Sequence, residues 1–261
     1  MDKKFRNLRN ENVDWDVVND FGTEWEEFRF ESYDLDILRK TWNQYFDIFP
    51  WEDISDNAEG FDMGCGSGRW AQFVIPRVGR LNCIDPSSAI HVAKSNLKKC
   101  DNAFFFKETV EKCSLENGSQ DFGYCLGVLH HIPDTLEGLK ACSKLLKKDA
   151  PFLLYLYYDF ENRSLLFKLV WKLSDVLRKV ISSLPSNIKI LTTTTIAYLV
   201  YYPLARLAYL LERLGFKTSH MPLSDYRKKS FYFMKTDALD RFGTRLEKRF
   251  SREKIHKMLI Q

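Results

Sequence analysis

The sequence lacks the features of a membrane-spanning, secreted or zinc-binding protein. It has no apolar run of the roughly 18 residues that a transmembrane helix needs, and no apolar signal segment follows Met1. Its six cysteines include no C-x-x-C pair, which argues against a disulfide framework and a zinc site. We therefore expect buried free thiols, no metal centre and a cytoplasmic location.

A nucleic-acid partner is not expected either, because no stripe of lysine and arginine interleaved with aromatic residues is present. The charge is nevertheless uneven. Residues 1–60 carry 7 basic and 16 acidic side chains, a balance of −9, whereas residues 161–235 carry 13 basic and 4 acidic, a balance of +9. Two interpretations remain open: the acidic segment packs near the basic one, or the basic segment meets an anionic substrate or membrane surface.

The most informative stretch is the glycine-rich run at 61–70. An apolar stub ends at Asp62, three glycines follow at alternate positions, and a helical pattern then begins. This layout is typical of a strand, a tight turn and a helix N-terminus, where a ligand can approach the main chain and meet N–H donors. It is not the dinucleotide fingerprint G-x-G-x-x-G, because Arg69 occupies the place of the third glycine.

Two further landmarks follow in order. Residues 81–85 indicate a short strand that ends in Asp85, whose carboxylate can accept both hydroxyls of a ribose. Residues 121–134 indicate another strand, which ends in the motif Leu-His-His-Ile-Pro-Asp. Together with the glycine loop, these motifs resemble the class I S-adenosylmethionine-dependent methyltransferases, and best of all their small-molecule branch. The resemblance covers roughly residues 57–157.

Alternating short apolar runs and helical patterns in this region predict βαβ units and a parallel sheet. We expect strands at 60–63, 80–84, 103–106, 121–126 and 151–157, and helices at 34–49, 68–77, 87–98, 110–113 and 135–147. The fold class is therefore α/β, a Rossmann-like, doubly wound, mostly parallel sheet. The family usually ends in an antiparallel hairpin, so either that hairpin is missing here or the sequence is a truncated form, and one sheet edge stays exposed.

Four segments are expected along the chain. They are an N-terminal helical cap (1–57), the S-adenosylmethionine-binding core (58–159), a helical lid insertion (160–235) and a C-terminal helical segment of the core (236–261). Within the insertion, Pro203 interrupts the second apolar helical stretch. The insertion is interpreted as a packed cap, as a tunnel for an apolar substrate, or as a peripheral contact with a membrane or a lipid-linked substrate. The oligomeric state is left open.

The resemblance assigns roles to individual residues. It places Asp62 near the cofactor ammonium and Asp85 on the ribose, although each acid could instead hold the backbone of its own turn. Thr109 stands where the family usually has an acid for the adenine amino group, so its hydroxyl or a backbone N–H would have to serve. The expected cofactor-binding set is Asp62, Gly64, Cys65, Gly66, Gly68, Arg69, Asp85, Pro86, Ser87, Thr109, Val110, Leu126 and Gly127.

His131 and His130 are the candidate general bases, because an imidazole near neutral pKa can take a proton from an acceptor hydroxyl. Helix capping or packing is the alternative role for both. The expected activity is methyl transfer to a small, partly apolar or anionic acceptor through a hydroxyl, carboxylate, amine or activated carbon. The rival functions are a non-catalytic cofactor-binding or membrane-surface module and an NAD(P)-binding oxidoreductase, and the spacing of the glycines argues against the oxidoreductase.

Overall fold

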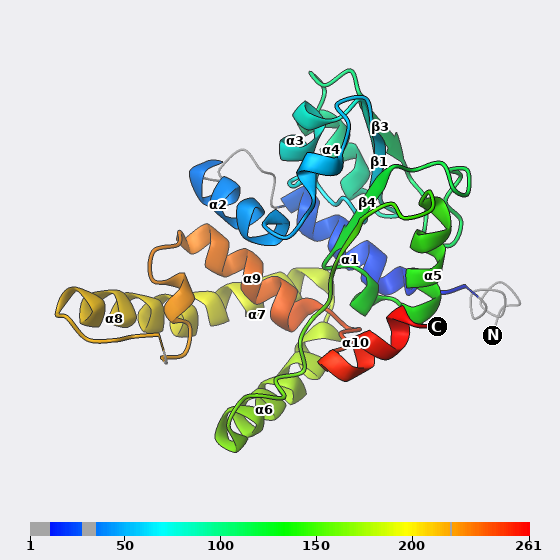
Figure 1. Cartoon of the computed structure of the whole chain (residues 1–261). Helices are drawn as coiled ribbons and strands as arrows, with labels where there is room; N and C mark the ends of the chain where they lie inside the picture. Colours follow the sequence, from blue (N-terminus) through cyan, green and yellow to red (C-terminus); the bar gives the residue numbers. More distant parts are fainter. Residues whose placement is uncertain (1–10, 28–34, 220) are drawn as a thin grey trace, which may run out of the picture. The chain divides into compact units, whose positions relative to one another are not determined.

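A computed structural model of the chain describes residues 11–27, 35–219 and 221–261 (Figure 1). The chain forms two compact units. The first contains the residues up to Glu161 together with Leu246–Gln261, and the second is Asn162–Arg245. The second unit therefore extends past the boundary expected at residue 235, because α9 (Phe231–Gly243) packs against two other helices of this unit.

The first unit is built on a parallel sheet whose order is β3-β2-β1-β4-β5. Its strands are β1 (Glu59–Met63), β2 (Arg80–Ile84), β3 (Ala103–Phe106), β4 (Phe122–Leu126) and β5 (Phe152–Tyr155). The strand order reverses between β1 and β4, and open α/β sheets bind their ligands at such a switch point. The expected Rossmann-like α/β fold is confirmed, and the strands lie close to their predicted positions.

Helices cover both faces of this sheet (Figure 1). They are α3 (Ala71–Val74), which continues as a 3₁₀ turn at Ile75–Arg77, α4 (Ala89–Asn96) and α5 (Thr135–Leu145). Right-handed crossovers place α3 and α4 on one face and α5 on the other. Two apolar clusters follow this division, one containing Leu81 and Tyr124 on the α3 and α4 side and one containing Phe61 and Met63 on the α5 side.

Two helices precede the sheet. The one expected at 34–49 is α2 (Leu35–Phe46), and it buries Leu38, Trp42 and Phe46 in the cluster on the α3 and α4 side. The other, α1 (Trp15–Glu27), was not predicted, because its sequence mixes Gly22 and several acids with scattered aromatic residues. The prediction of a short helix at 110–113 is wrong. This segment forms turns, and the Glu108 carboxylate stabilises them by accepting from Ser114 N at 2.7 Å and Ser114 Oγ at 3.0 Å.

The chain returns to the first unit beside the end of β5. Phe250 N donates to Tyr157 O at 2.8 Å, and Asp159 N donates to Phe250 O at 3.2 Å. These bonds form a short parallel bridge between Tyr158 and Phe250, just beyond the end of β5. Helix α10 (Arg252–Leu259) follows and is capped by Ser251, whose side chain accepts from Lys254 N. Among the described residues the sheet has five strands, and the antiparallel hairpin is not among them.

The regular elements among the described residues of the second unit are all helical. It consists of α6 (Leu165–Ser182), α7 (Ser186–Ile196), a π-helical turn (Ala197–Tyr201), α8 (Tyr202–Arg213), a 3₁₀ turn (Ser224–Tyr226) and α9. The π-helical turn ends two residues before Pro203, which has no backbone N–H to donate to the helix. A small core of Ala197, Tyr201, Ala205, Met234 and Ala238 holds the unit together. None of the helices among the described residues has the length and apolar character needed to cross a membrane.

Candidate active site

The glycine loop that follows β1 adopts a conformation that only glycine takes easily. Gly64, Gly66 and Gly68 have φ values of 77°, 54° and 77°. A Cβ atom on Gly64 would lie 2.2 Å from Val128 Cγ2, so any side chain there would force the loop away from β4. Backbone conformation and lack of space together account for the glycine at position 64.

Hydrogen bonds within the protein hold this loop. Gly64 N and Cys65 N donate to Ile84 O at 2.7 and 3.0 Å, and Gly68 N donates to Cys65 O at 2.9 Å. Gly66 N donates to Asp85 Oδ2 at 2.9 Å. These four amides are therefore not the N–H donors that the sequence led us to expect for a ligand. The loop offers a ligand close approach to a backbone without side chains.

Asp85 organises the turn after β2. Its Oδ1 atom accepts from Ser87 N at 2.9 Å and from Ser87 Oγ at 2.5 Å, in addition to the bond from Gly66 N to Oδ2. Burial raises the pKa of Asp85, and the bonds from Ser87 and Gly66 act in the opposite direction. A carboxylate offers about four lone-pair positions. Three are used here, so the structural role leaves room for one hydroxyl of a ligand.

Asp62 has one unsatisfied oxygen in the site. Its side chain is 2% exposed, and Oδ2 has no hydrogen-bond partner among the described residues. Burial raises the pKa of Asp62 to about 8. The nearby Tyr124 hydroxyl and the Arg69 charge oppose this effect, and the Asp85 charge adds to it. Because a buried polar atom without a partner is costly, a ligand with a charged N–H donor suits this position. The ammonium of S-adenosylmethionine is such a group.

Ser67 supplies a second buried polar atom in the same loop. Its Oγ has no hydrogen-bond partner in the described part of the chain, and the residue is 1% exposed. Gly127, at the end of β4, has φ of 81°, and a Cβ atom placed there would meet nothing within 4 Å. The switch point between β1 and β4 therefore has open space on the β4 side and unsatisfied polar atoms on the β1 side.

The remaining predicted cofactor residues lie on the loops after β2 and β3. Pro86 directly precedes Ser87 in the turn that Asp85 holds. Thr109 and Val110 are half-buried in the loop after β3, where Thr109 O accepts from Lys112 N at 3.2 Å. Parallel strands bring these loops to the same sheet edge as the glycine loop.

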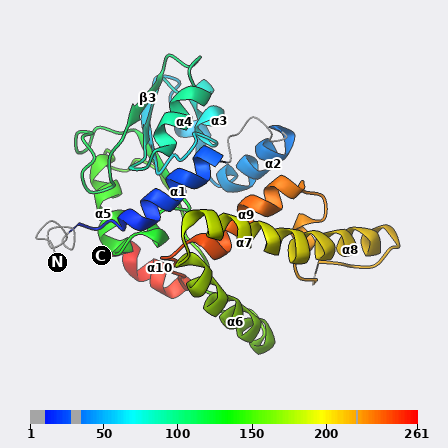
Figure 2. The same ribbon diagram turned by 180° about the vertical axis from the view of Figure 1, so that it is seen from behind.

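Helix α1 runs along this edge, from the α5 side toward α4 (Figure 2). A Cβ atom on Gly66 would lie 3.2 Å from the indole nitrogen of Trp25, and one on Gly22 would lie 2.7 Å from Ser88 Oγ. The Arg69 guanidinium stacks on the Trp25 ring at 4.9 Å from its centroid. The helix thus passes directly over the glycine loop and the Asp85 turn.

Asn12 attaches the segment before α1 to the start of α5. Its Oδ1 accepts from Asp134 N at 2.5 Å, and its Nδ2 donates to Asp134 O at 2.7 Å. Asp134 in turn caps α5 by accepting from Leu136 N and Glu137 N. This pair of bonds fixes the N-terminal end of the segment that covers the site.

The two histidines differ in their hydrogen bonding. His131 Nδ1 lies 2.7 Å from Leu246 O. Because a carbonyl only accepts, Nδ1 carries the proton and Nε2 is the basic nitrogen of the neutral ring. The Phe21 ring of α1 lies 5.0 Å from the His131 ring. His131 therefore combines a fixed tautomer with a position under α1.

His130 is fully buried, and neither ring nitrogen has a partner within the described part of the chain. Its ring packs on Tyr157 with centroids 3.8 Å apart. Burial lowers its pKa strongly, and the nearby His131 and Arg249 add to this effect. The ring is thus held in its neutral form.

Sequence reasoning missed three residues of the site. Tyr124 of β4 pairs with Asp62 of β1. Only the register of these two strands could have identified Tyr124 as a residue of the site. Trp25 depends on the unpredicted α1. Ser67 lies between two of the glycines, and its burial with an unsatisfied hydroxyl follows only from the fold.

Comparison with known proteins gives the family context. A family model described as a methyltransferase domain matches residues 61–152. A ubiquinone biosynthesis O-methyltransferase of Nitrosomonas europaea is 32% identical over 106 residues, which are 40% of this chain and 43% of that protein. The corresponding enzyme of Saccharophagus degradans is 33% identical over 89 residues, covering 33% of this chain and 38% of that protein. The chain thus spans less than half the length of either relative.

Solved structures with a related arrangement include the YcgJ protein from Bacillus subtilis, with a TM-score of 0.44 and 21% identity over 56% of this chain and 60% of that one. A S-adenosylmethionine-dependent methyltransferase from Aquifex aeolicus has a TM-score of 0.39 and 17% identity over 51% of this chain and 78% of that one. The family match covers the glycine loop, the Asp85 turn and the strand that ends at the histidines. This match and the strand order support a class I S-adenosylmethionine-dependent methyltransferase domain at residues 61–152.

Proposed function

We propose that this protein transfers a methyl group from S-adenosylmethionine to a small-molecule acceptor. The observation that carries the proposal is the buried Asp62 carboxyl group, whose Oδ2 atom has no hydrogen-bond partner among the described residues, beside a positive-φ glycine loop at the switch point of the sheet. When bound, S-adenosylmethionine supplies an activated methyl group on a sulfonium. The match of residues 61–152 to a methyltransferase domain supports the same conclusion.

The proposal assigns the following cofactor roles. Asp62 accepts from the cofactor ammonium, and the backbone at Gly64, Cys65, Gly66, Gly68 and Arg69 lets the methionine part approach closely. Asp85 accepts from the ribose with the oxygen position that its turn leaves unused. The adenine is lined by Pro86, Ser87, Thr109 and Val110. Leu126 and Gly127 border the methionine part from the β4 side, where the structure has open space.

We assign the general base to His131. Its Nδ1 proton is held by Leu246 O, so Nε2 is the nitrogen able to take a proton from an acceptor. An acceptor hydroxyl agrees with the names of the two curated relatives, both of them O-methyltransferases. His130 has both ring nitrogens buried and a strongly lowered pKa. We therefore give it a packing role and not a catalytic one.

The acceptor is inferred to be partly apolar. The part of α1 that lies over the site contributes Phe21 and Trp25, whose rings lie close to His131 and to the glycine loop. Such a surface favours an aromatic or aliphatic acceptor that carries one reactive hydroxyl. Positioning of that hydroxyl against the methyl donor supplies most of the acceleration expected here, because in-line orientation is the main requirement of the reaction.

A cytoplasmic location is part of the same proposal. All six cysteines are free thiols, and Cys65, Cys83, Cys125 and Cys142 are buried. Burial raises the pKa of Cys65 and Cys125, which keeps both in the unreactive thiol form. Free thiols persist most readily in a reducing compartment.

Calorimetric titration with S-adenosylmethionine tests the proposal, with NADH titrated in parallel. We expect saturable binding of S-adenosylmethionine alone. The Asp62→Asn variant should bind it roughly tenfold more weakly, because the charge-assisted contact to the ammonium is lost. Asp53→Asn is the matched control, since Asp53 is an exposed acid with no role in the site. Binding of NADH in place of S-adenosylmethionine, or no loss in Asp62→Asn, would contradict the proposal.

Turnover is tested separately. The protein is incubated with methyl-labelled S-adenosylmethionine and a panel of phenols, catechols and aliphatic alcohols, and transfer of the label is measured. Label in an acceptor establishes the enzyme and its acceptor class. Tight cofactor binding without transfer to any member of the panel would favour the rival non-catalytic module.

A further inference from the structure

The outer face of α6 exposes a stripe of aliphatic side chains. Seven of its aliphatic side chains are each more than half exposed. They are Leu165, Leu169, Val170, Leu173, Val176, Leu177 and Val180. At 3.6 residues per turn these positions occupy an arc of about 140° around the helix axis. An apolar stripe of this width normally faces a protein core, but here it faces outward.

The opposite face of α6 explains this orientation, because its polar side chains anchor the helix within the unit. Arg178 is 4% exposed. It donates to Asp175 Oδ1 at 2.8 Å and to the backbone oxygens of Thr244 and Arg245 at 2.8 and 3.1 Å. Arg241 donates to Ser174 Oγ at 2.9 Å. These buried polar contacts fix the rotation of the helix, so the apolar stripe cannot turn inward without breaking them.

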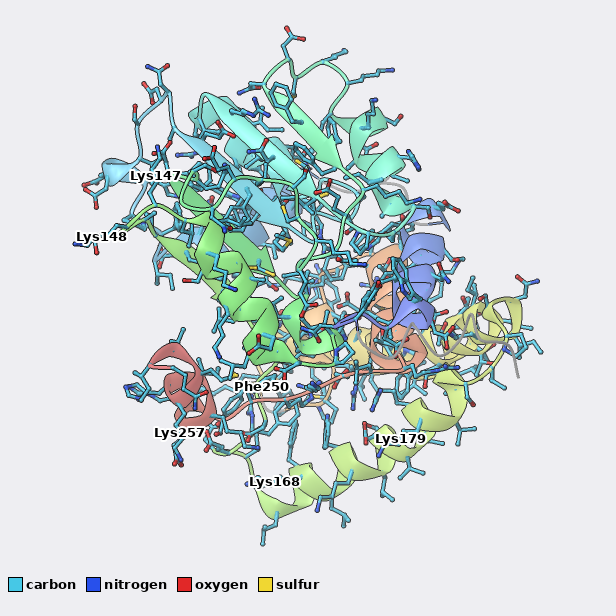
Figure 3. The ribbon with its side chains drawn as sticks, turned by 90° about the vertical axis from the view of Figure 1, so that its right-hand side faces the viewer. Lys147, Lys148, Lys168, Lys179, Phe250 and Lys257 are labelled. Carbon is cyan, nitrogen blue, oxygen red and sulfur yellow. The ribbon has the colours of Figure 1, made fainter. Side chains whose placement is uncertain are left out.

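Basic side chains border the stripe. Lys168, Lys172 and Lys179 all fall within about 60° of one edge of the apolar arc, and Figure 3 labels Lys168 and Lys179 toward opposite ends of α6. The one acid of this helix, Asp175, lies on the inner side and is ion-paired with Arg178 and Lys179. Lys168 and Lys172 therefore add positive charge beside the aliphatic side chains, whereas Asp175 balances the charge of Lys179.

We propose that α6 is an interfacial helix that binds the surface of an anionic membrane. Its aliphatic stripe enters the boundary between headgroups and acyl chains, and the lysine side chains extend along it to reach lipid phosphates. An 18-residue helix is about 27 Å long, and it lies parallel to the membrane plane. This inference concerns a partner of the second unit and does not depend on methyl transfer.

Charge decides between a membrane and a second copy of the chain. Residues 161–235 carry 13 basic and 4 acidic side chains, so two copies that met through this region would bring together two balances of +9. An anionic lipid surface is attracted by the same charge. The observed combination of stripe and lysine row thus favours lipid over self-association.

The test is co-sedimentation of the full chain with phosphatidylcholine vesicles, with and without about one third phosphatidylglycerol. We expect binding to the anionic vesicles only, with loss at high salt. The variant Leu169→Gln/Leu173→Gln/Val176→Gln makes the stripe polar while keeping residues with good helix propensity. The variant Lys168→Glu/Lys172→Glu reverses the charge of two lysines beside the stripe. Each should weaken binding by roughly tenfold or more. Lys98→Glu/Lys99→Glu, with the same charge change on exposed lysines of the first unit, should bind normally.

Folding and self-association are checked in the same samples. The replaced side chains are mostly exposed, so the helical circular dichroism of all variants should match the parent. S-adenosylmethionine affinity should also be unchanged, which separates this proposal from the function of the first unit. Absence of vesicle binding by the parent protein would overturn the proposal. So would equal binding by the glutamine variant, or a dimer in analytical ultracentrifugation that the glutamine variant disperses while vesicles are not bound.

Discussion

Asp62 of β1 and Tyr124 of β4 are paired across the strand register at the switch point, and both side chains are buried. The Tyr124 hydroxyl lies near the carboxyl group of Asp62 without a hydrogen bond of ordinary geometry, and neither Asp62 Oδ2 nor the hydroxyl has a partner among the described residues. Burial of this pair raises the pKa of both groups. The Asp62 carboxyl group therefore suits a cationic ligand, and it carries a proton when no cation is bound.

The first prediction concerns this proton. The pKa of Asp62 is about 8, so the group is mostly protonated at neutral pH. An ammonium favours the ionised carboxylate and lowers that pKa, so binding of S-adenosylmethionine at about pH 7 should release a proton. Calorimetry in buffers of different ionisation enthalpy measures the release. The Asp62→Asn variant should release none, and an identical buffer dependence in both proteins would count against the assignment.

The second prediction separates strain from crowding in the glycine loop. Gly64→Ala should lower the free energy of unfolding by about 2–4 kcal/mol, because it adds left-handed strain and a contact at 2.2 Å from Val128. Gly127→Ala has a similar positive φ but open space around it, and should cost only about 1–2 kcal/mol. Urea denaturation measures both. Equal losses would show that the contact with Val128 is relieved without cost.

The same pair of variants also reports on the ligand. A methyl group at position 127 enters the space that we assign to the methionine part of the cofactor. Gly127→Ala should therefore weaken S-adenosylmethionine binding even though it remains folded. Unchanged affinity would show that the cofactor does not occupy the space beside Gly127.

The third prediction is a stabilising substitution. His130 has two buried ring nitrogens without partners, so His130→Phe should raise the free energy of unfolding by about 1 kcal/mol near pH 8. The pKa of His130 is lowered from 6.5 in the folded protein. The unfolded chain therefore binds a proton that the folded protein does not, and the parent loses stability as the pH falls through and below 6.5.

The advantage of the phenylalanine variant should accordingly grow between about pH 7 and about pH 5. Urea denaturation of both proteins across this range measures the difference. An advantage that shrinks toward low pH would mean that His130 is charged in the folded protein. A loss of methyl transfer in a stable His130→Phe protein would indicate that His130 acts as the base.

The fourth prediction tests His131. Replacement by glutamine keeps a donor for Leu246 O but removes the basic Nε2 atom. The turnover number on a hydroxyl acceptor should fall by about 10²–10⁴-fold, with S-adenosylmethionine affinity unchanged. His91→Gln is the control, since His91 is exposed on α4. If the remaining activity of His131→Gln kept the pH dependence of the parent, the base would be another group.

Local sequence patterns were sufficient for much of the first unit. The strands alternate with helical patterns over short distances, and the glycines at 64, 66 and 68 allow the positive φ values that the structure shows. The position of Asp85 at the end of β2 follows from the same local reading. The turn at 110–113 was misread because its conformation depends on Glu108 and Ser114, which bond across the loop.

The sequence by itself determined the order of the elements, the glycine loop and the chemical class of the site, because each depends on residues close together in the chain. Only the tertiary structure decided which groups remain unsatisfied and which faces remain exposed. The unsatisfied Oδ2 atom of Asp62 depends on burial between neighbouring strands, and the His131 tautomer depends on a carbonyl 115 positions away. The outward stripe of α6 depends on the buried bonds of Arg178, because these contacts outweigh the amphipathic pattern.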